Sequence, residues 1–319
     1  GTAAAGQKVN YNVSFKELET DTVLHVNSTK TDENGFFVAD DFATENDFVK
    51  VVVSNEDGSG YDAITLEYDT TDILTGIYDA TSGSFMVTPL TSLIAEGVAT
   101  GTVTAEQIAT KKSEFETKLG LSAGSLDINS YDASTSESDL VSLTSATTYI
   151  DSIVSTIALS IQTSGITEAE KIELIRISLY SLIESSPSVD FTDSSFITAV
   201  VDTVATKIDE LTNVTIDETR KSEIVSGLNS ITTSIQSVIN EGGSTSDLVL
   251  NLHECKTQIK TALTSGTAVE SLTLTVIQNV SVTVATEVNI TTEPTSESEP
   301  ESTSESEPES EPESEPESE

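Results

Sequence analysis

The hydrophobic pattern along this 319-residue chain changes its period twice. Residues 1–87 contain short runs in which apolar and polar side chains alternate, which is typical of half-buried strands. Residues 88–265 carry apolar side chains at helical spacing, and from Leu272 the period returns to two. The pattern therefore predicts an α+β multidomain protein with separate strand-rich and helical parts.

The N-terminal region, residues 1–87, is expected to fold as a small β-sandwich. Short apolar runs mark its predicted strands, at residues 9–15, 23–26, 36–38, 48–53, 64–68 and 85–87. Polar turns at residues 32–35 and 55–60 separate some of these runs, and their Asn, Asp and Gly residues suit tight hairpins. Short strands with turn signals at this spacing are typical of a sandwich.

The junction with the helical region lies at residues 85–94. Proline suits the first turn of a helix, and Thr88 precedes Pro89 as a suitable N-cap. Leu90, Leu93 and Ile94 then share one helical face. We therefore expect the last strand of the sandwich to lead directly into a helix.

Residues 88–265 are expected to form a helical bundle of about six helices. Each predicted helix has a single apolar stripe, so the helices must pack on one another or on the sandwich. Capping boxes mark the helix starts at residues 104–107, 167–170 and 215–218. Gly120 and the glycines at 242–243 mark two of the helix ends.

Residues 266–292 are expected to supply one long strand, or two short strands with a break near residues 278–279. Apolar side chains occupy its even-numbered positions, namely Leu272, Leu274, Val276, Val280, Val282, Val284, Val288 and Ile290. A strand this apolar on one face needs a partner in water. It is expected to close onto the sandwich, to pair with a further domain or to add to a neighbouring subunit.

The last 27 residues, 293–319, repeat Ser, Glu and Pro and predict a disordered acidic tail. The net charge is −40, and about a dozen of these charges lie in the tail, so the remainder carries about −28. Nucleic acid and anionic membranes bind basic patches, so neither is an expected partner. No run of 18 apolar residues predicts a membrane span. The chain begins at Gly1 without leader-like segments, so we expect a removed leader or a piece of a longer protein.

Two short runs resemble known functional motifs, but the elements predicted around them do not fit those motifs. Residues 120–124 have the spacing of a nucleophile elbow, but a predicted helix precedes them and a loop follows. Residues 58–63 resemble a dinucleotide fingerprint, but an alternating segment follows where a helix is required. His25 lies in a predicted strand, and Cys255 continues an apolar helical stripe beside His253. No transition-metal cluster is expected, and the protein is not expected to be an enzyme.

Calcium is the metal that the sequence suggests, because hard oxygen ligands occur at the turns of the predicted sandwich. The candidate ligands are Asp32, Asn34, Asn55, Asp57, Asp62, Asp69 and Asp72. None of them fits the twelve-residue EF-hand loop. The alternative, that these are solvated turn residues, stays open.

Several short motifs carry a resemblance to known proteins. Residues 31–37, Thr-Asp-Glu-Asn-Gly-Phe-Phe, resemble a hairpin of carboxypeptidase-regulatory-like, or transthyretin-type, β-sandwiches. Residues 72–76, 118–121 and 126–132 follow in the order found in modular bacterial surface proteins. In the same order, residues 87–94 resemble their "TPLTTL" helical segment, with Ser92 replacing the second Thr. The resemblance covers roughly residues 30–165 and implies an adhesin or cell-surface scaffold without catalysis.

The acidic tail is also similar to low-complexity stretches of marine phage and algal-virus structural proteins. We therefore expect a secreted, non-enzymatic structural protein of a cell or virion surface, which acts in assembly or adhesion. Its predicted contact, with itself or with another surface protein, uses the strand at residues 271–291. The alternative is a calcium- or carbohydrate-binding module at the sandwich loops.

Overall fold

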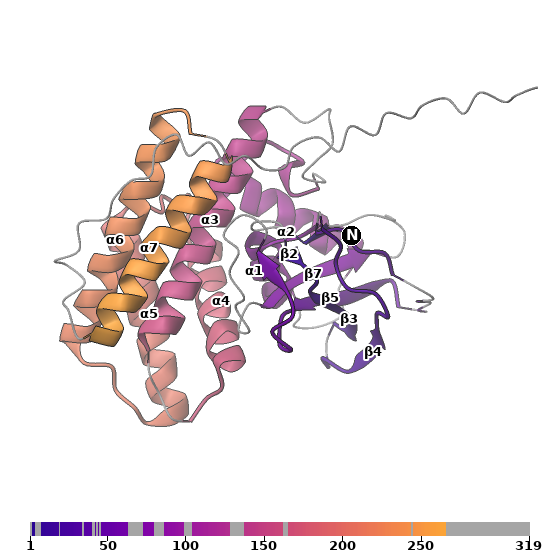
Figure 1. Ribbon diagram of the computed structural model, residues 1–319, viewed down its shortest axis with the longest axis horizontal. Coiled ribbons are helices and arrows are strands. Elements are labelled where there is room, and N and C mark those ends of the chain that lie inside the picture. The colour runs from indigo at the N-terminus through magenta and orange to yellow at the C-terminus, as the bar shows by residue number, and fades with distance from the viewer. Residues whose placement is uncertain are drawn as a thin grey trace, which may run out of the picture. The chain divides into compact units, whose positions relative to one another are not determined.

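The computed structural model has an α+β fold, with small sheets near the N-terminus followed by seven α-helices (Figure 1). The residues that it describes all belong to one compact unit. They are residues 2–3, 8–18, 20–33, 35–39, 42, 44, 46–62, 73–79, 86–98, 104–127, 137–161, 165–243 and 245–265. The predicted strand at 64–68, the C-terminal strand and the acidic tail lie outside the described residues.

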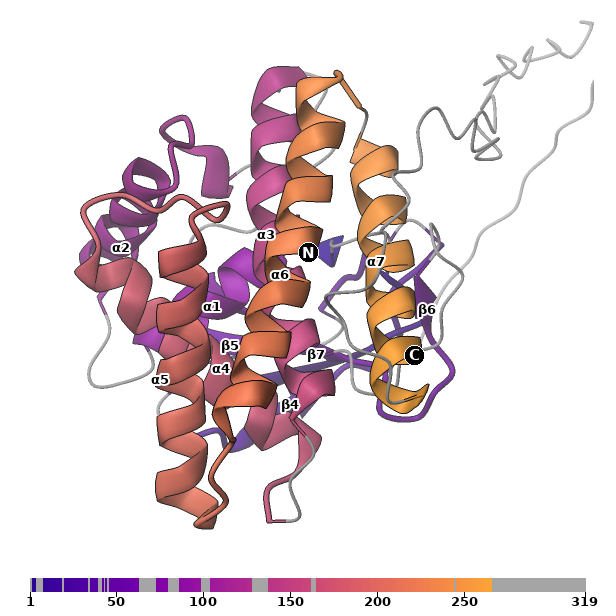
Figure 2. The same cartoon turned by 90° about the vertical axis from the view of Figure 1, so that its left-hand side faces the viewer.

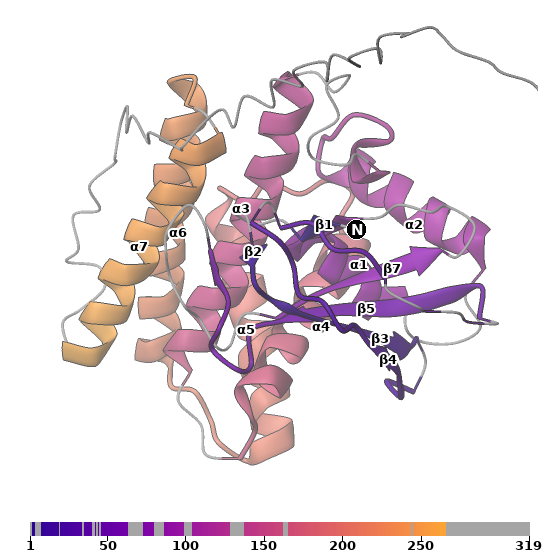
Figure 3. The ribbon, with the colours of Figure 1, turned by 45° about the vertical axis from the view of Figure 1, so that its right-hand side comes forward.

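A four-stranded antiparallel sheet is the main β element (Figure 3). Its spatial order is β4-β3-β5-β7, formed by Val23–Val26, Asn12–Glu17, Phe48–Ser54 and Ile73–Asp79. Two short pairs accompany it. β2 (Lys8–Val9) pairs antiparallel with β6 (Tyr61–Asp62), and β1 (Thr2–Ala3) pairs parallel with β8 (Met86–Val87).

The two faces of this sheet have different neighbours. On one face Val13 and Phe15 of β3 lie opposite Val53 and Val51 of β5, and these side chains form a core with Leu74 of β7. The other face meets helix α1, which packs on β7. Strand β7 is therefore covered on both sides, and the hydrophobic pattern did not predict it.

Helix α1 (Pro89–Val98) begins where the sequence predicts. The Thr91 N–H donates to Oγ1 of Thr88 at 3.0 Å, as an N-cap requires. The Ser92 hydroxyl lies fully buried against β7, where it accepts the Thr75 N–H at 2.8 Å and donates to the Thr75 carbonyl at 3.1 Å. This polar contact fixes the helix to the sheet.

The remaining helices form a bundle in which α3 is central, since it packs on α1, α4, α6 and α7 (Figure 2). Their bounds are Ala105–Lys118 for α2, Glu137–Ser160 for α3, Glu168–Ser185 for α4, Ser194–Thr212 for α5, Glu218–Asn240 for α6 and Thr245–Ser265 for α7; a 3₁₀ helix η1 spans Ser125–Asp127. No helix in these described ranges is long and apolar enough to cross a membrane.

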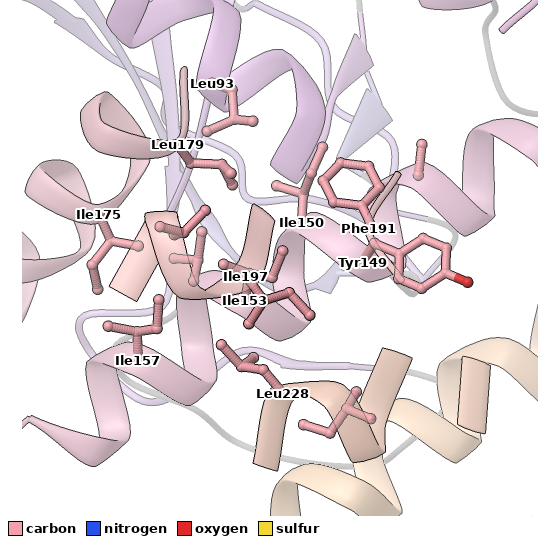
Figure 4. Close-up of a cluster of buried hydrophobic side chains, with 14 of the residues drawn as sticks. Leu93, Tyr149, Ile150, Ile153, Ile157, Ile175, Leu179, Phe191, Ile197 and Leu228 are labelled. Carbon is pink, nitrogen blue, oxygen red and sulfur yellow. The ribbon is translucent and has the colours of Figure 1, made fainter. Parts of the chain in front are cut away.

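The bundle core is built from the apolar stripes of these helices (Figure 4). Ile150, Ile153 and Ile157 of α3 are fully buried, and they lie among Leu179 of α4 and Leu228 of α6. An isoleucine stripe on the central helix gives every neighbour the same branched, stiff surface to pack against.

Two of the three predicted capping boxes are confirmed, at Thr104 and Thr167. The third prediction is wrong, because the N-cap of α6 is Asp217, whose carboxylate accepts the Arg220 N–H at 2.8 Å. Thr215 instead donates its hydroxyl to Asp209 at 2.7 Å. Gly120 ends α2 with a φ of 67°, as predicted.

Candidate functional site

An exposed apolar surface lies at the outer strand of the four-stranded sheet. Among the described residues, seven large hydrophobic side chains are exposed; three of them belong to β4, and two belong to the segment that follows it, ten and twelve residues after Val26. We call these five the β4 edge: Val23, Leu24, Val26, Phe36 and Val38. Val26 is 63% exposed and Val38 is 71% exposed. Apolar side chains gathered in this way are typical of an interaction surface.

The strand order explains why this surface stays open. Strand β4 pairs with β3, where Val26 lies opposite Ser14, and no described strand pairs with its other side. Helix α1 covers the opposite end of the sheet, at β7 (Figure 1). Alternate N–H and C=O groups of an outer strand point away from the sheet, so β4 can pair with a further strand.

The segment after β4 is held against it by a buried amide. The Asn27 side chain donates to the carbonyls of Val38 at 2.7 Å and Thr29 at 2.9 Å. Farther along this segment, the Phe42 ring stacks on Phe15 with a centroid distance of 4.4 Å. These contacts place Val38 beside the end of β4 and order the β4 edge before any partner binds.

Strand β4 itself is a neutral part of a strongly acidic chain. Residues 22–29 contain no acidic or basic side chain apart from His25, whereas the whole chain carries a net charge of −40. The His25 ring packs on the sheet core, with its centroid 5.4 Å from that of Phe42. The prediction that His25 lies in a strand is confirmed, since it belongs to β4.

The predicted calcium ligands that the structure describes lie in different local networks. Asp57 accepts the Lys30 ammonium at 2.5 Å, which holds the pKa of its carboxyl well below the usual range. Asp62 pairs with Lys8 at 3.2 Å where β2 meets β6, and both side chains are largely buried. Asn55 and Asp32 bind backbone: Asn55 is fully buried and bonds both polar groups of Gly60, and Asp32 accepts the Phe36 N–H at 2.9 Å.

The other three candidates, Asn34, Asp69 and Asp72, lie outside the described residues. Within the described part of the chain, no three or more His, Cys, Asp or Glu side chains form a group that could hold a metal ion. Calcium binding at these turns stays a prediction, and calorimetric titration with millimolar calcium would test it. Absence of a binding heat would rule it out.

A cluster of charged side chains joins the sheet to the helical bundle, and the sequence pattern did not predict it. Lys50 of β5 lies 3.2 Å from Glu96 of α1 and 3.2 Å from Asp21. Glu173 of α4 lies nearby, and burial and then Glu96 raise the pKa of its carboxyl. Lysine within the otherwise apolar run at residues 49–53 was the available signal. The Lys50 ammonium offsets the charge of the buried Glu96 carboxylate in this cluster.

Two further motifs that the sequence suggested lie within the described residues. Helix α2 precedes residues 120–124 and the 3₁₀ helix η1 follows, so the nucleophile-elbow context is missing there. Cys255 is 1% exposed on α7, and burial raises the pKa of its thiol to about 11. A buried thiol of this kind is a small core residue and a poor nucleophile.

Comparisons with protein-family models, curated proteins and solved structures give no match to this chain. The resemblance to carboxypeptidase-regulatory-like sandwiches and bacterial surface proteins therefore stays a prediction from the quoted motifs. The β4 edge is the largest group of exposed apolar side chains among the described residues, and it is therefore the candidate functional surface.

Proposed function

We propose that this chain is a non-enzymatic structural protein of a cell or virion surface, which acts in assembly or adhesion and binds its partner through the β4 edge. The exposed, uncharged, apolar character of that edge carries the proposal. Its five apolar side chains and the outward backbone groups of β4 together suit the addition of a strand.

Proteins that remain monomeric usually protect an outer strand. Charged side chains, proline, strong bulges or a covering helix prevent one copy from pairing with the next. Strand β4 is short, with four residues, and has a register shift opposite Phe15 and Lys16, but it carries valine and leucine where a protected edge carries lysine or glutamate. The composition of β4 therefore supports a function in which this strand pairs with a strand of a partner.

The charge of the chain supports specific rather than indiscriminate association. A net charge of −40 makes copies repel one another over most of their surface. The uncharged residues 22–29 add nothing to that repulsion, so copies of the chain can approach one another at this strand. The surface location rests on the Ser- and Thr-rich composition without Trp, and on the resemblance to bacterial surface proteins.

A matched pair of lysine substitutions in the full chain tests the proposal. Val26→Lys places a charge in the β4 edge, and Leu211→Lys places the same charge at the end of α5, where Leu211 is also exposed. We expect the wild type and the Leu211→Lys chain to form the same oligomers or filaments in sedimentation velocity and negative-stain microscopy, and the Val26→Lys chain to remain monomeric.

Thermal unfolding of all three chains shows whether either substitution disturbs the fold. A wild-type chain that stays monomeric up to about 1 mM would overturn the assembly role. Equal assembly by the Val26→Lys chain would overturn the assignment of the interface to β4.

A further inference from the structure

We infer that the β4 edge receives residues 272–290 of a second copy of the chain as an added strand. This inference rests on the proposed function and names the partner of the same site. It assigns two complementary surfaces to one chain: a donor segment after α7 and an acceptor strand within the sheet.

The donor segment has the chemistry that the acceptor requires. Its even-numbered positions from Leu272 to Ile290 are apolar with two exceptions, Gln278 and Thr286, and most odd-numbered positions are Ser, Thr or Asn. Residues 271–286 contain no charged side chain, in a chain with 54 acidic residues. A period-two strand would present its apolar side chains beside the exposed valine and leucine side chains of β4 while its backbone pairs with that strand.

The donor segment and the acceptor strand each need a partner. Strand β4 has a neighbour on one side only among the described strands. The donor segment is too apolar on one face to stand alone in water, and it is followed by a tail of one charge sign that offers it no apolar cover. Pairing the two strands buries both apolar surfaces in one contact.

The position of α7 favours a second copy over pairing within the chain. Helix α7 ends at Ser265 and packs on α3 and α6, whereas β4 packs on β3 at the far side of the sheet (Figure 1). The residues from Ser265 to Val282, the donor position tested below, span roughly 60 Å when fully extended, so pairing within one chain would use about half of the donor segment as a linker. Helix layers about 10 Å apart and strands about 5 Å apart place β4 several elements away from α7.

A contact of this kind joins two different surfaces of the same chain. Such an interface is heterologous, so it continues from copy to copy until the series closes as a ring or grows as a filament. Because the copies repel through their net charge, we expect added salt to increase assembly.

Blocking each half of the contact in a different full-length chain tests the inference. Val26→Lys blocks the acceptor, and Val282→Lys blocks the donor. Thr283→Lys is the matched control, because it adds the same charge to the opposite face of the donor. We expect both blocked chains to be monomeric and the Thr283→Lys chain to assemble like the wild type.

An equimolar mixture of the two blocked chains gives the sharpest result. The Val26→Lys chain keeps an intact donor and the Val282→Lys chain keeps an intact acceptor, so the mixture has one working interface. We expect heterodimers and no larger species in sedimentation velocity. A mixture that remains monomeric, or a Thr283→Lys chain that fails to assemble, would overturn the inference.

The same variants separate failure of the inference from failure of the proposed function. If the Val282→Lys chain assembles like the wild type and the Val26→Lys chain stays monomeric, the donor assignment is wrong and β4 is still the interface. If both blocked chains assemble, the assignment of the interface to β4 is wrong as well. Leu24→Cys combined with Val282→Cys and a short bismaleimide tests the second copy directly: a ladder of covalent oligomers supports it, and a cross-linked monomer places the contact within one chain.

Discussion

The ammonium of Lys50 on β5 lies 3.2 Å from the carboxylate of Glu96 on α1, and both side chains are only 7% exposed. Asp21, at 3.2 Å, is the second partner of the lysine, and the Thr75 hydroxyl donates to Glu96 at 3.4 Å. Burial lowers the pKa of Lys50, but the two carboxylates more than offset this effect, so the pKa is raised. The sheet and the first helix are thus joined by a buried charge pair as well as by apolar packing.

Replacing Lys50 with methionine should destabilise the fold strongly, because Glu96 would remain buried without its cation. Removal of one partner from a buried ion pair costs about 3–5 kcal/mol of unfolding free energy. Urea unfolding followed by circular dichroism measures the loss. Lys30→Met is the control, since its pair with Asp57 is exposed to solvent and should contribute much less to the unfolding free energy. Equal small losses in both variants would contradict the buried pairing.

The Lys50→Met, Glu96→Leu double variant extends the same measurement. Removing both charges replaces the pair with apolar side chains, which is often close to neutral for a buried ion pair. We therefore expect the double variant to be more stable than the single Lys50→Met chain. A double variant as unstable as the sum of both single variants would mean that the two residues do not act as a pair.

Replacing Gly97 on α1 with alanine should destabilise the protein, although helix propensity alone predicts that it would stabilise it. Alanine in place of an interior helical glycine normally stabilises a protein by about 1 kcal/mol. Here a Cβ atom on Gly97 would lie 2.1 Å from Cε2 of Tyr180, whose ring stacks on Phe115 at 5.2 Å. Since that ring has little room to move, we expect Gly97→Ala to destabilise the protein by about 1–3 kcal/mol in urea unfolding.

Gly165→Ala is the control for this crowding. A Cβ atom there would meet Thr212 at an ordinary contact distance of 3.6 Å. Its unfolding free energy should therefore stay within about 0.5 kcal/mol of the wild type. A stabilised Gly97→Ala chain would show that α1 and α4 pack less closely than the structure describes.

The start of α6 distinguishes two capping arrangements. Asp217 accepts the Arg220 N–H at 2.8 Å, whereas Thr215 bonds the exposed Asp209 side chain. We expect Asp217→Ala to lower the unfolding free energy by about 1 kcal/mol, the usual loss for an N-cap, and Thr215→Ala to lower it by less than half of that. The reverse order in chemical denaturation would restore the capping box at residues 215–218.

Local signals predicted the helices well, and relationships between distant residues account for what they missed. Capping boxes and stripes at 3.6-residue spacing are contained in one segment, so α2 and α4 begin where the sequence indicates. Strand β7 has the sheet core on one face and α1 on the other, so Thr75 and Leu74 are both buried and no polar face marks the strand.

The candidate site depends even more on distant relationships. Residues 23–26 were predicted as a strand, but their position at the outside of the sheet follows from pairing with β3 and from the place of α1 at β7. The Lys50–Glu96 pair joins residues 46 positions apart. The hydrophobic period and the spacing of motifs in the sequence do not show which strand is outermost in the sheet or which charged residues form ion pairs. Long-range packing decides both.

Acid stability should depend on Lys111. Its ammonium lies 2.5 Å from Glu184, and this contact lowers the pKa of the Glu184 carboxyl. A carboxyl group whose pKa is lowered by folding stabilises the folded state at pH values above its unfolded pKa of about 4.3. This stabilisation is lost as the pH falls from there through the lower pKa of the folded state. We expect Lys111→Met to flatten the fall in melting temperature between about pH 5 and pH 3. An unchanged pH profile would show that the pair does not persist in solution.

Cys255 should report the opening of α7. Its side chain is 1% exposed, and burial raises the pKa of the thiol to about 11, so at pH 8 only about one thiol in a thousand is ionised. We expect native protein to resist iodoacetamide at pH 8 for hours and protein in 8 M urea to react fully within minutes. Thr257→Cys, on an exposed position of the same helix, provides the control and should react in the native state. Rapid, stoichiometric labelling of native Cys255 would mean that α7 leaves the bundle readily, and the donor segment that follows it would then start from a mobile helix.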